Sequence, residues 1–141
     1  MKVIVTGGCG YIGSHVARAF KLNGDEVLII DKVKREHTLK DIDGYYIGDF
    51  SNDDSLATLV DYLPDIVVHC AGTSLVGPSM VNPSEYYNNN VAKTLKLLDH
   101  IKRIIPRTRI IFSSSAATYG IPPASLPCQE TFVTKPISPY G

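Results

Sequence analysis

A glycine-rich turn near the amino terminus places the tightest limit on how this chain can fold. Residues 2–5 form an apolar run typical of a short buried strand, and glycines follow at positions 7, 10 and 13 in the spacing G-x-x-G-x-x-G. Apolar side chains between residues 16 and 22 then recur at helical spacing. Residues 2–22 therefore predict a strand, a glycine turn and a helix.

Each glycine of the turn has a separate expected role. Gly7 lets the backbone turn sharply, Gly10 lets it approach a diphosphate without a β-carbon in the way, and Gly13 lets the helix lie close on the strand. The first free amides of the helix and the positive end of its dipole then face the phosphates of a ligand. Taken alone, the same spacing also fits a tight turn that binds no ligand.

An aspartate after the second predicted strand favours a dinucleotide. Residues 26–30 are an apolar run that ends on Asp31, about twenty residues beyond the glycines. A carboxylate there accepts hydrogen bonds from the ribose hydroxyls of adenosine, and its charge favours NAD over NADP, which carries a 2′-phosphate. Lys32, Lys34 and Arg35 follow, and they could accommodate that phosphate or lie in a solvated loop. We predict NAD, with NADP as the alternative.

The composition excludes several other classes of protein. The 141 residues suffice for one domain, are 44% hydrophobic and have a formal net charge of zero, so no polyanion-binding surface and no nucleic acid partner are expected. No apolar run approaches the roughly 18 residues of a membrane span. The three cysteines lie far apart without a metal-ligand pattern, which predicts a cytoplasmic protein without a metal.

Short apolar runs alternate with helical segments along the chain. This alternation predicts an α/β fold, a Rossmann-type doubly wound parallel sheet of about five strands in the order 3-2-1-4-5. Prolines beyond residue 115 predict an irregular tail over residues 116–141. The later strands are expected over residues 44–47, 65–72 and 109–112, and the later helices over residues 53–63 and from 83 or 84 to about 104.

Polar residues at the ends of these strands are further candidates for the site. Asp49 could bond the adenine amino group while Phe50 lines its pocket, or Asp49 could simply begin a turn. Ala71 and Gly72 end the fourth strand, where the strand order reverses. Asparagine is a poor interior helix residue, so residues 88–90 suggest hydrogen bonds to backbone or cofactor. Residues 113–115 could bind cofactor or satisfy loop amides.

Taken in order, these motifs resemble the N-terminal part of the extended short-chain dehydrogenase/reductase family, and within it UDP-glucose (UDP-galactose) 4-epimerases. Sugar-nucleotide dehydratases of this family usually carry Thr-Asp-Glu where this chain has Ser115-Ala116-Ala117, while a UDP-pentose 4-epimerase remains an alternative. The resemblance spans all 141 residues and rests on residues 6–15, 48–49, 69–72, 85–91, 112–115, 119–120 and 138–141.

The resemblance implies an enzyme that interconverts UDP-hexoses by transient oxidation at C4, with NAD as the cofactor. By the same resemblance, Ser115 bonds the 4-hydroxyl of the sugar, and Tyr140 removes its proton as phenolate. Asn90 and Ser113 help to seat the nicotinamide half, and no metal is involved. The implied cofactor-binding residues are Gly7, Gly10, Tyr11, Ile12, Gly13, Asp31, Asp49, Phe50, Ala71, Gly72, Asn90 and Ser113.

Two departures from the family's pattern limit what the 141 residues are expected to do. Ser74 stands where epimerases usually have a lysine that contacts the cofactor ribose. The family's base belongs to a Tyr-x-x-x-Lys motif, and the sequence reaches only Gly141. Residues 1–141 are therefore expected to be an incomplete Rossmann domain without that helix, the sixth strand or the C-terminal substrate domain.

Alternative functions follow from those missing parts. The chain alone is expected to be inactive and to meet a UDP-sugar only when a C-terminal part completes it. Without the helix after Tyr140, apolar surface should be uncovered on the fifth strand and the long helix, and such surface usually marks an interface. The alternatives are thus a non-catalytic interaction module that forms homo-oligomers, or half of an enzyme completed by another chain.

Overall fold

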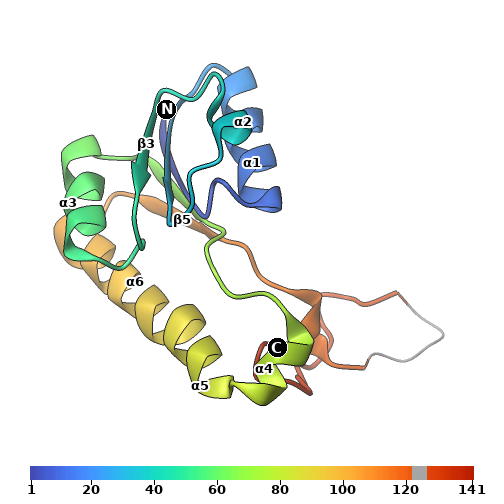
Figure 1. Ribbon diagram of the computed structural model, residues 1–141. Coiled ribbons are helices and arrows are strands. Elements are labelled where there is room, and N and C mark those ends of the chain that lie inside the picture. The colour runs from blue at the N-terminus through green and yellow to red at the C-terminus, as the bar shows by residue number, and fades with distance from the viewer. Residues whose placement is uncertain (122–126) are drawn as a thin grey trace. The chain divides into compact units, whose positions relative to one another are not determined.

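The computed structural model of the chain describes residues 1–121 and 127–141, which form two units (Figure 1). The first unit comprises Met1–Gly72 and Lys93–Ser113. The second comprises Thr73–Ala92 and Ser114–Gly141. Residues 122–126, part of the expected tail, lie outside the described residues.

A parallel sheet of five strands forms the centre of the first unit, in the order β3-β2-β1-β4-β5. This order confirms the predicted Rossmann-type topology. The central strand β1 pairs with β2, the next strand in the sequence, and with β4, which begins about sixty residues after β1. The connection from β3 to β4 therefore crosses from one side of β1 to the other. The strands are β1 (Lys2–Thr6), β2 (Glu26–Asp31), β3 (Gly44–Ile47), β4 (Ile66–His69) and β5 (Arg109–Phe112).

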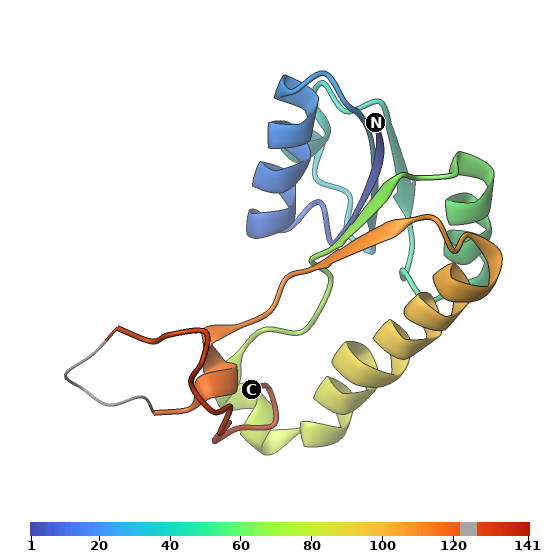
Figure 2. The same cartoon turned by 180° about the vertical axis from the view of Figure 1, so that it is seen from behind.

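Helices cover both faces of this sheet because the central strands bear apolar side chains on both sides (Figures 1 and 2). On one face, α1 (Tyr11–Leu22) packs Ala17 against β1, β2 and β4. On the other, α3 (Asp53–Tyr62) and α6 (Lys93–Ile104) pack Leu59 and Leu97 against Ile4 and its neighbours. The short α2 (Glu36–Leu39) lies between β2 and β3 in sequence.

Helix α3 begins and ends where the sequence pattern places it. Asn52 is its N-cap residue, although its side chain makes no capping hydrogen bond, and Asp53 and Asp54 stand in the first turn, where the helix dipole favours them. Leu63 terminates the helix in the left-handed conformation with φ of 52°, and Pro64 follows.

The second unit contains shorter helical segments than the sequence suggests. A continuous helix from residue 83 to about 104 is predicted, but a π-helix interrupts it at the asparagine cluster, where the side chains of Asn89 and Asn90 bond Thr73. A 3-10 helix also forms early in the expected irregular tail. The segments of this unit are α4 (Val76–Val81), α5 (Pro83–Tyr86), the π-helix η1 (Tyr87–Ala92) and the 3-10 helix η2 (Ala116–Tyr119).

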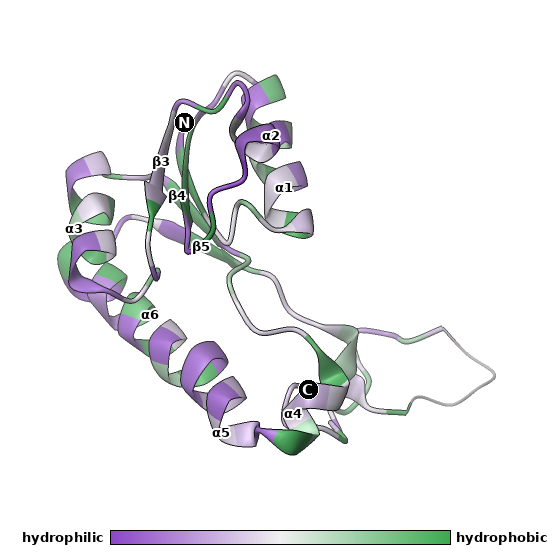
Figure 3. Cartoon of the chain, viewed as in Figure 1, coloured by the Kyte–Doolittle hydropathy of each residue, from purple (hydrophilic) through white to green (hydrophobic). Residues whose placement is uncertain are grey.

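Strand β5 lies at one edge of the sheet, and all four of its residues are exposed. Ile110, Ile111 and Phe112 are 38%, 49% and 57% exposed. All four residues of β4, by contrast, are buried, although Figure 3 shows that both β4 and β5 carry apolar residues. Over the residues that the structure describes, no helix is both long and apolar enough to cross a membrane.

Candidate nucleotide-binding site

The glycine turn between β1 and α1 is held close to the end of β4. Gly7 has φ of +71°, and a β-carbon on it would lie 2.7 Å from the Cα atom of Ala71. Its backbone N–H donates to the carbonyl of Ile30 at 2.8 Å. The turn therefore needs glycine at position 7 both for its backbone conformation and for its contact with Ala71.

The start of α1 offers backbone amides without a capping side chain. Gly10 is the N-cap residue, and no side chain makes a capping hydrogen bond there. A β-carbon on Gly10 would lie 3.2 Å from the carbonyl oxygen of Gly7. Tyr11 and Ile12 are 79% and 54% exposed, and no acidic residue lies in the first turn. Such a helix start suits an anion.

The carboxylate of Asp31 is tied to this turn. Its Oδ2 accepts a hydrogen bond from the backbone N–H of Cys9 at 2.9 Å, and its Oδ1 accepts one from Val33 at 3.0 Å. Asp31 also accepts, through its backbone carbonyl, the N–H of Gly48 at 2.8 Å. The carboxylate is thus fixed beside the turn that would hold a diphosphate, with acceptor positions left for hydroxyl groups.

Two of the three basic residues after Asp31 have carboxylate partners. The ammonium of Lys32 lies 2.9 Å from Oδ2 of Asp49, and that of Lys34 lies 2.8 Å from Glu36. Arg35 is the exposed N-cap residue of α2. Lys32 therefore contributes to the neighbouring Asp49 site, and Lys34 belongs to a solvated surface pair.

The Asp49 side chain is 12% exposed and gathers several donors. Oδ1 accepts from the backbone N–H and the hydroxyl of Ser51 at 3.0 and 2.7 Å, and Oδ2 accepts from Lys93 at 2.6 Å. Burial raises the pKa of this carboxyl, but the donors, with Lys93 first and Lys32 next, together hold it well below its ordinary value. Lys93 was missed by the sequence analysis because it lies 44 residues away and no local pattern marks it.

Phe50 and the strand ends behind it belong to the core. Phe50 is only 6% exposed, and its ring meets His69 edge-on at 4.7 Å between centroids. The two nitrogens of His69 bond the hydroxyls of Thr6 at 2.6 Å and Thr94 at 3.0 Å. Burial lowers the pKa of His69 to about 4, so the ring is neutral at pH 7 and links β1, β4 and α6.

The last site residues of the first unit lie where β4 and β5 end. Gly72 is exposed, and Ala71 packs behind Gly7. The backbone N–H of Ser113 donates to the carbonyl of His69 at 3.0 Å. Burial raises the pKa of the neighbouring Cys70 thiol, and a hydrogen bond with Ser113 opposes that shift.

In the second unit, Asn90 clamps the backbone of Thr73. Its Oδ1 accepts from the Thr73 N–H at 2.8 Å and its Nδ2 donates to the Thr73 carbonyl at 2.9 Å, while Asn89 donates to the Thr73 hydroxyl at 3.0 Å. The asparagine cluster was expected to bond either backbone or cofactor, and the structure shows bonds to backbone. Thr73 was missed as part of this arrangement because it lies 17 positions from Asn90 and no local pattern joins the two residues.

Ser115 and Tyr140 also belong to the second unit. Ser115 is the N-cap residue of η2, and its hydroxyl accepts from the N–H of Ala117 at 3.2 Å. The backbone N–H of Tyr140 donates to the Ser79 hydroxyl at 3.3 Å, and its ring meets Tyr86 edge-on. A β-carbon on Gly141 would lie 2.5 Å from the carbonyl oxygen of Ala117, so the segment with Tyr140 lies against η2.

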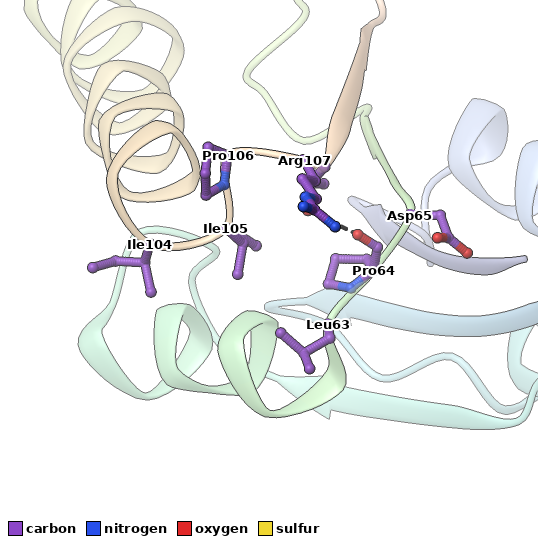
Figure 4. Close-up of a pocket in the computed structure, with 8 residues that line it drawn as sticks. Leu63, Pro64, Asp65, Ile104, Ile105, Pro106 and Arg107 are labelled. Atoms are coloured by element: carbon purple, nitrogen blue, oxygen red, sulfur yellow. Dashed lines mark hydrogen bonds between the residues drawn. The ribbon is translucent and has the colours of Figure 1, made fainter.

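A cavity in the first unit lies away from these residues. It has a volume of about 360 Å³, and Asp65, which directly precedes β4, lines it together with Leu63 and Ile104 (Figure 4). It thus opens at the amino end of β4, whereas the glycine turn and Asp31 follow the carboxyl ends of β1 and β2. Ligands of open α/β sheets bind at the carboxyl ends, so this cavity is separate from the candidate site.

Comparison with known proteins gives consistent matches over the whole chain. Residues 3–141 match the NAD dependent epimerase/dehydratase family. A UDP-glucose 4-epimerase of Halalkalibacterium halodurans is 41% identical, and a bifunctional UDP-glucose and UDP-xylose 4-epimerase of Pisum sativum is 34% identical. The alignments cover 100% and 99% of this chain but only 42% and 43% of the two relatives, so the chain spans about two fifths of their length.

A solved structure agrees with these relatives. The UDP-glucose 4-epimerase of Brucella ovis, in complex with NAD, superposes with a TM-score of 0.90 at 37% sequence identity. The superposition covers 99% of this chain and 43% of that one.

Proposed function

Because the chain belongs to the NAD dependent epimerase/dehydratase family, we propose that it is the NAD-binding part of a UDP-glucose 4-epimerase-like protein. One observation carries the proposal: the Asp31 carboxylate is hydrogen-bonded to Cys9 within the glycine turn. A ribose acceptor is thereby fixed beside uncapped helix amides, as recognition of adenosine diphosphate requires. The Brucella ovis relative, which binds NAD, supports the same cofactor.

We assign the cofactor's parts to named residues on this basis. The amides after Gly10, at Tyr11, Ile12 and Gly13, take the diphosphate, and Asp31 takes the adenosine ribose. Asp49 takes the adenine, and Phe50 contributes only the small exposed part of its ring. Gly72 borders the cofactor in front of Ala71, and Ser113 and Asn90 help to seat the nicotinamide half, with Asn90 also fixing Thr73.

We assign one reaction to the UDP-glucose 4-epimerase-like protein of which this chain is the proposed NAD-binding part. That reaction is the transient oxidation of a UDP-sugar at C4. Bound NAD supplies the hydride acceptor. Ser115 holds the 4-hydroxyl, and Tyr140 takes its proton. We propose UDP-hexoses as the substrates. UDP-pentoses are the alternative, because the name of the Pisum sativum relative includes UDP-xylose.

We expect the 141-residue polypeptide to bind NAD, and its lack of epimerase activity on its own is part of the proposal. The test is calorimetric titration with NAD, NADP and a UDP-hexose, after a check for cofactor carried through purification. Micromolar NAD binding with weaker NADP binding supports the proposal. A folded chain that binds no dinucleotide overturns it.

A second candidate function is self-association or completion by another chain. The exposed apolar residues of β5 favour it, since an uncovered apolar sheet edge usually meets a partner. We expect no nucleic acid or membrane partner, given the zero net charge and the absence of a long apolar run. The unpaired thiols of Cys9, Cys70 and Cys128 favour a reducing, cytoplasmic setting.

A further inference from the structure

The carboxylate of Asp49 has nearly all of its acceptor capacity in use. A carboxylate offers about four lone-pair positions on its two oxygens. Ser51 occupies two of them on Oδ1 through its N–H and its hydroxyl, and Lys93 occupies one on Oδ2 with a bond of 2.6 Å. The ammonium of Lys32 faces the same Oδ2 at 2.9 Å. A ligand that bonds Asp49 must therefore take the position that Lys32 faces or displace a firmer donor.

The two lysines differ in how firmly they are held. Lys93 is the first residue of α6, its side chain is 24% exposed, and it forms a short hydrogen bond. Lys32 follows the end of β2, its side chain is 55% exposed, and its ion pair with Asp49 is longer, at 2.9 Å. An exposed ion pair is screened and contributes little, while a partly buried charge-assisted hydrogen bond is among the stronger polar contacts. Lys32 is thus the donor that is most easily replaced.

The position of Asp49 places this cluster next to the ribose acceptor. Asp31 pairs with Ile47 in the register of β2 and β3, and its carbonyl accepts the N–H of Gly48. Asp49 is the next residue, so the two carboxylates follow neighbouring strand ends. A nucleoside whose ribose bonds Asp31 extends its base over this part of the site. An adenine 6-amino group is a neutral donor that suits a carboxylate acceptor.

We propose that Lys93 is a positioning residue that fixes the Asp49 carboxylate to accept the adenine 6-amino group, and that Lys32 yields its place to that group. The inference rests on the proposed function, because it needs an adenine dinucleotide at the site. Lys93 and Ser51 hold the carboxylate from two sides and keep it charged. Lys32 competes with the ligand for one acceptor position. The two lysines therefore have opposite effects on affinity.

The test compares NAD with nicotinamide hypoxanthine dinucleotide, which carries an oxygen in place of the 6-amino group. Lys93→Met keeps most of the length of the side chain and removes its ammonium group, and Lys93→Arg restores a charged donor. Lys96→Met is the matched control, because Lys96 makes the adjacent pair between α6 and Asp53, 2.9 Å long and exposed. Lys32→Met tests the competing cation, and all dissociation constants are measured by calorimetry on the 141-residue chain.

The wild-type chain is expected to bind NAD about tenfold more tightly than the hypoxanthine analogue, the effect of one hydrogen bond to a charged group. Lys93→Met should remove most of this preference by lowering the affinity for NAD and not the affinity for the analogue. Lys93→Arg should recover part of the preference, and Lys96→Met should change the affinity for neither dinucleotide. Lys32→Met binds NAD at least as tightly as the wild type. If Lys93→Met does not fold, Ser51→Ala should lower the same preference to a smaller extent.

The results that overturn the inference differ from those that overturn the function. The role of Lys93 is refuted if the wild-type chain binds the two dinucleotides with equal affinity. It is also refuted if a folded Lys93→Met chain loses affinity for both dinucleotides to the same extent. Either result leaves the proposal of NAD binding standing. Tighter binding in the wild type than in Lys32→Met refutes the role of Lys32. A folded wild-type chain that binds neither dinucleotide refutes the proposed function and this inference with it.

Discussion

A β-carbon on Gly13 would overlap the carbonyl oxygen of Gly7 and would lie 2.8 Å from its carbonyl carbon. The obstacle is backbone rather than a flexible side chain, so α1 or the glycine turn must shift to admit one methyl group. We expect Gly13→Ala to lower the free energy of unfolding by about 1 to 3 kcal/mol, the usual cost of overpacking. Urea unfolding followed by circular dichroism measures this difference.

Gly77→Ala is the matched control for that substitution. Gly77 lies in α4, and a β-carbon there would meet no atom within 4 Å among the described residues beyond its chain neighbours and the nearby backbone of α4. Because alanine is the better helix former, the variant should be neutral or more stable by up to about 1 kcal/mol. Equal destabilisation by the two substitutions would show that the close contact between Gly13 and Gly7 is unimportant.

Asp31→Asn should weaken NAD binding by about tenfold or more, because the amide removes the charge that strengthens hydrogen bonds to the ribose hydroxyls. The affinity for NADP should fall less, since the negative charge that opposes a 2′-phosphate is also removed. Calorimetry measures both. Asp54→Asn, on the exposed first turn of α3, should leave both affinities unchanged. An unaltered ratio of NAD to NADP affinity in Asp31→Asn would contradict the assigned role.

The stability of the fold should fall with pH below about 6.5, because of His69. Its pKa is lowered from 6.5 to about 4 in the folded chain, so protons bind the unfolded chain first. The contribution of neutral His69 to the free energy of unfolding is complete above pH 6.5 and is lost as the pH falls towards 4. At pH 5 the loss should be about 2 kcal/mol, measured by urea unfolding at several pH values.

His69→Gln tests whether this group causes the slope. Glutamine removes the titrating ring, so stability should change less between pH 7 and 5 than in the wild type, although the variant is less stable throughout. The exposed His37 is the control, and His37→Gln should keep the wild-type slope. A wild-type stability that is flat from pH 7 to 5 would exclude the depressed pKa.

Exposure of β5 predicts concentration-dependent self-association. Ile111→Lys places a charge on the 49% exposed apolar residue in the middle of the edge strand and should shift the chain towards monomer in gel filtration with light scattering. Leu22→Lys, at an 81% exposed residue on α1, should leave the distribution unchanged. A wild-type chain that stays monomeric at high concentration would count against the second candidate function.

The sheet could be predicted because its signals are local. Each strand is a short apolar run, and the glycine turn and Asp31 lie about twenty residues apart, within one strand-helix-strand unit. Alternation of strands and helices then leaves few topologies, since crossover connections are right-handed. The order of the five strands follows from these local patterns.

The contacts of the polar residues could not be predicted because their partners are distant in sequence. Lys93 reaches Asp49 across 44 residues, and the cluster at Asn88 to Asn90 gives no sign that Thr73 is its partner. The π-helix lies at residues whose side chains make these bonds, whereas a periodicity argument gives a continuous helix. Residue type showed that these positions were polar and in need of partners, and only the fold identified the partners.

The separation of 44 positions between Asp49 and Lys93 also separates the two groups in time during synthesis on the ribosome. At about 5 to 20 residues per second, this interval lasts about 2 to 9 seconds. Strands β1, β2 and β3 are neighbours in the sheet and emerge first, and they bring the glycine turn, Asp31 and Asp49 with them. Until α6 emerges, the nascent chain therefore has Lys32 but not Lys93 as a partner for the Asp49 carboxylate.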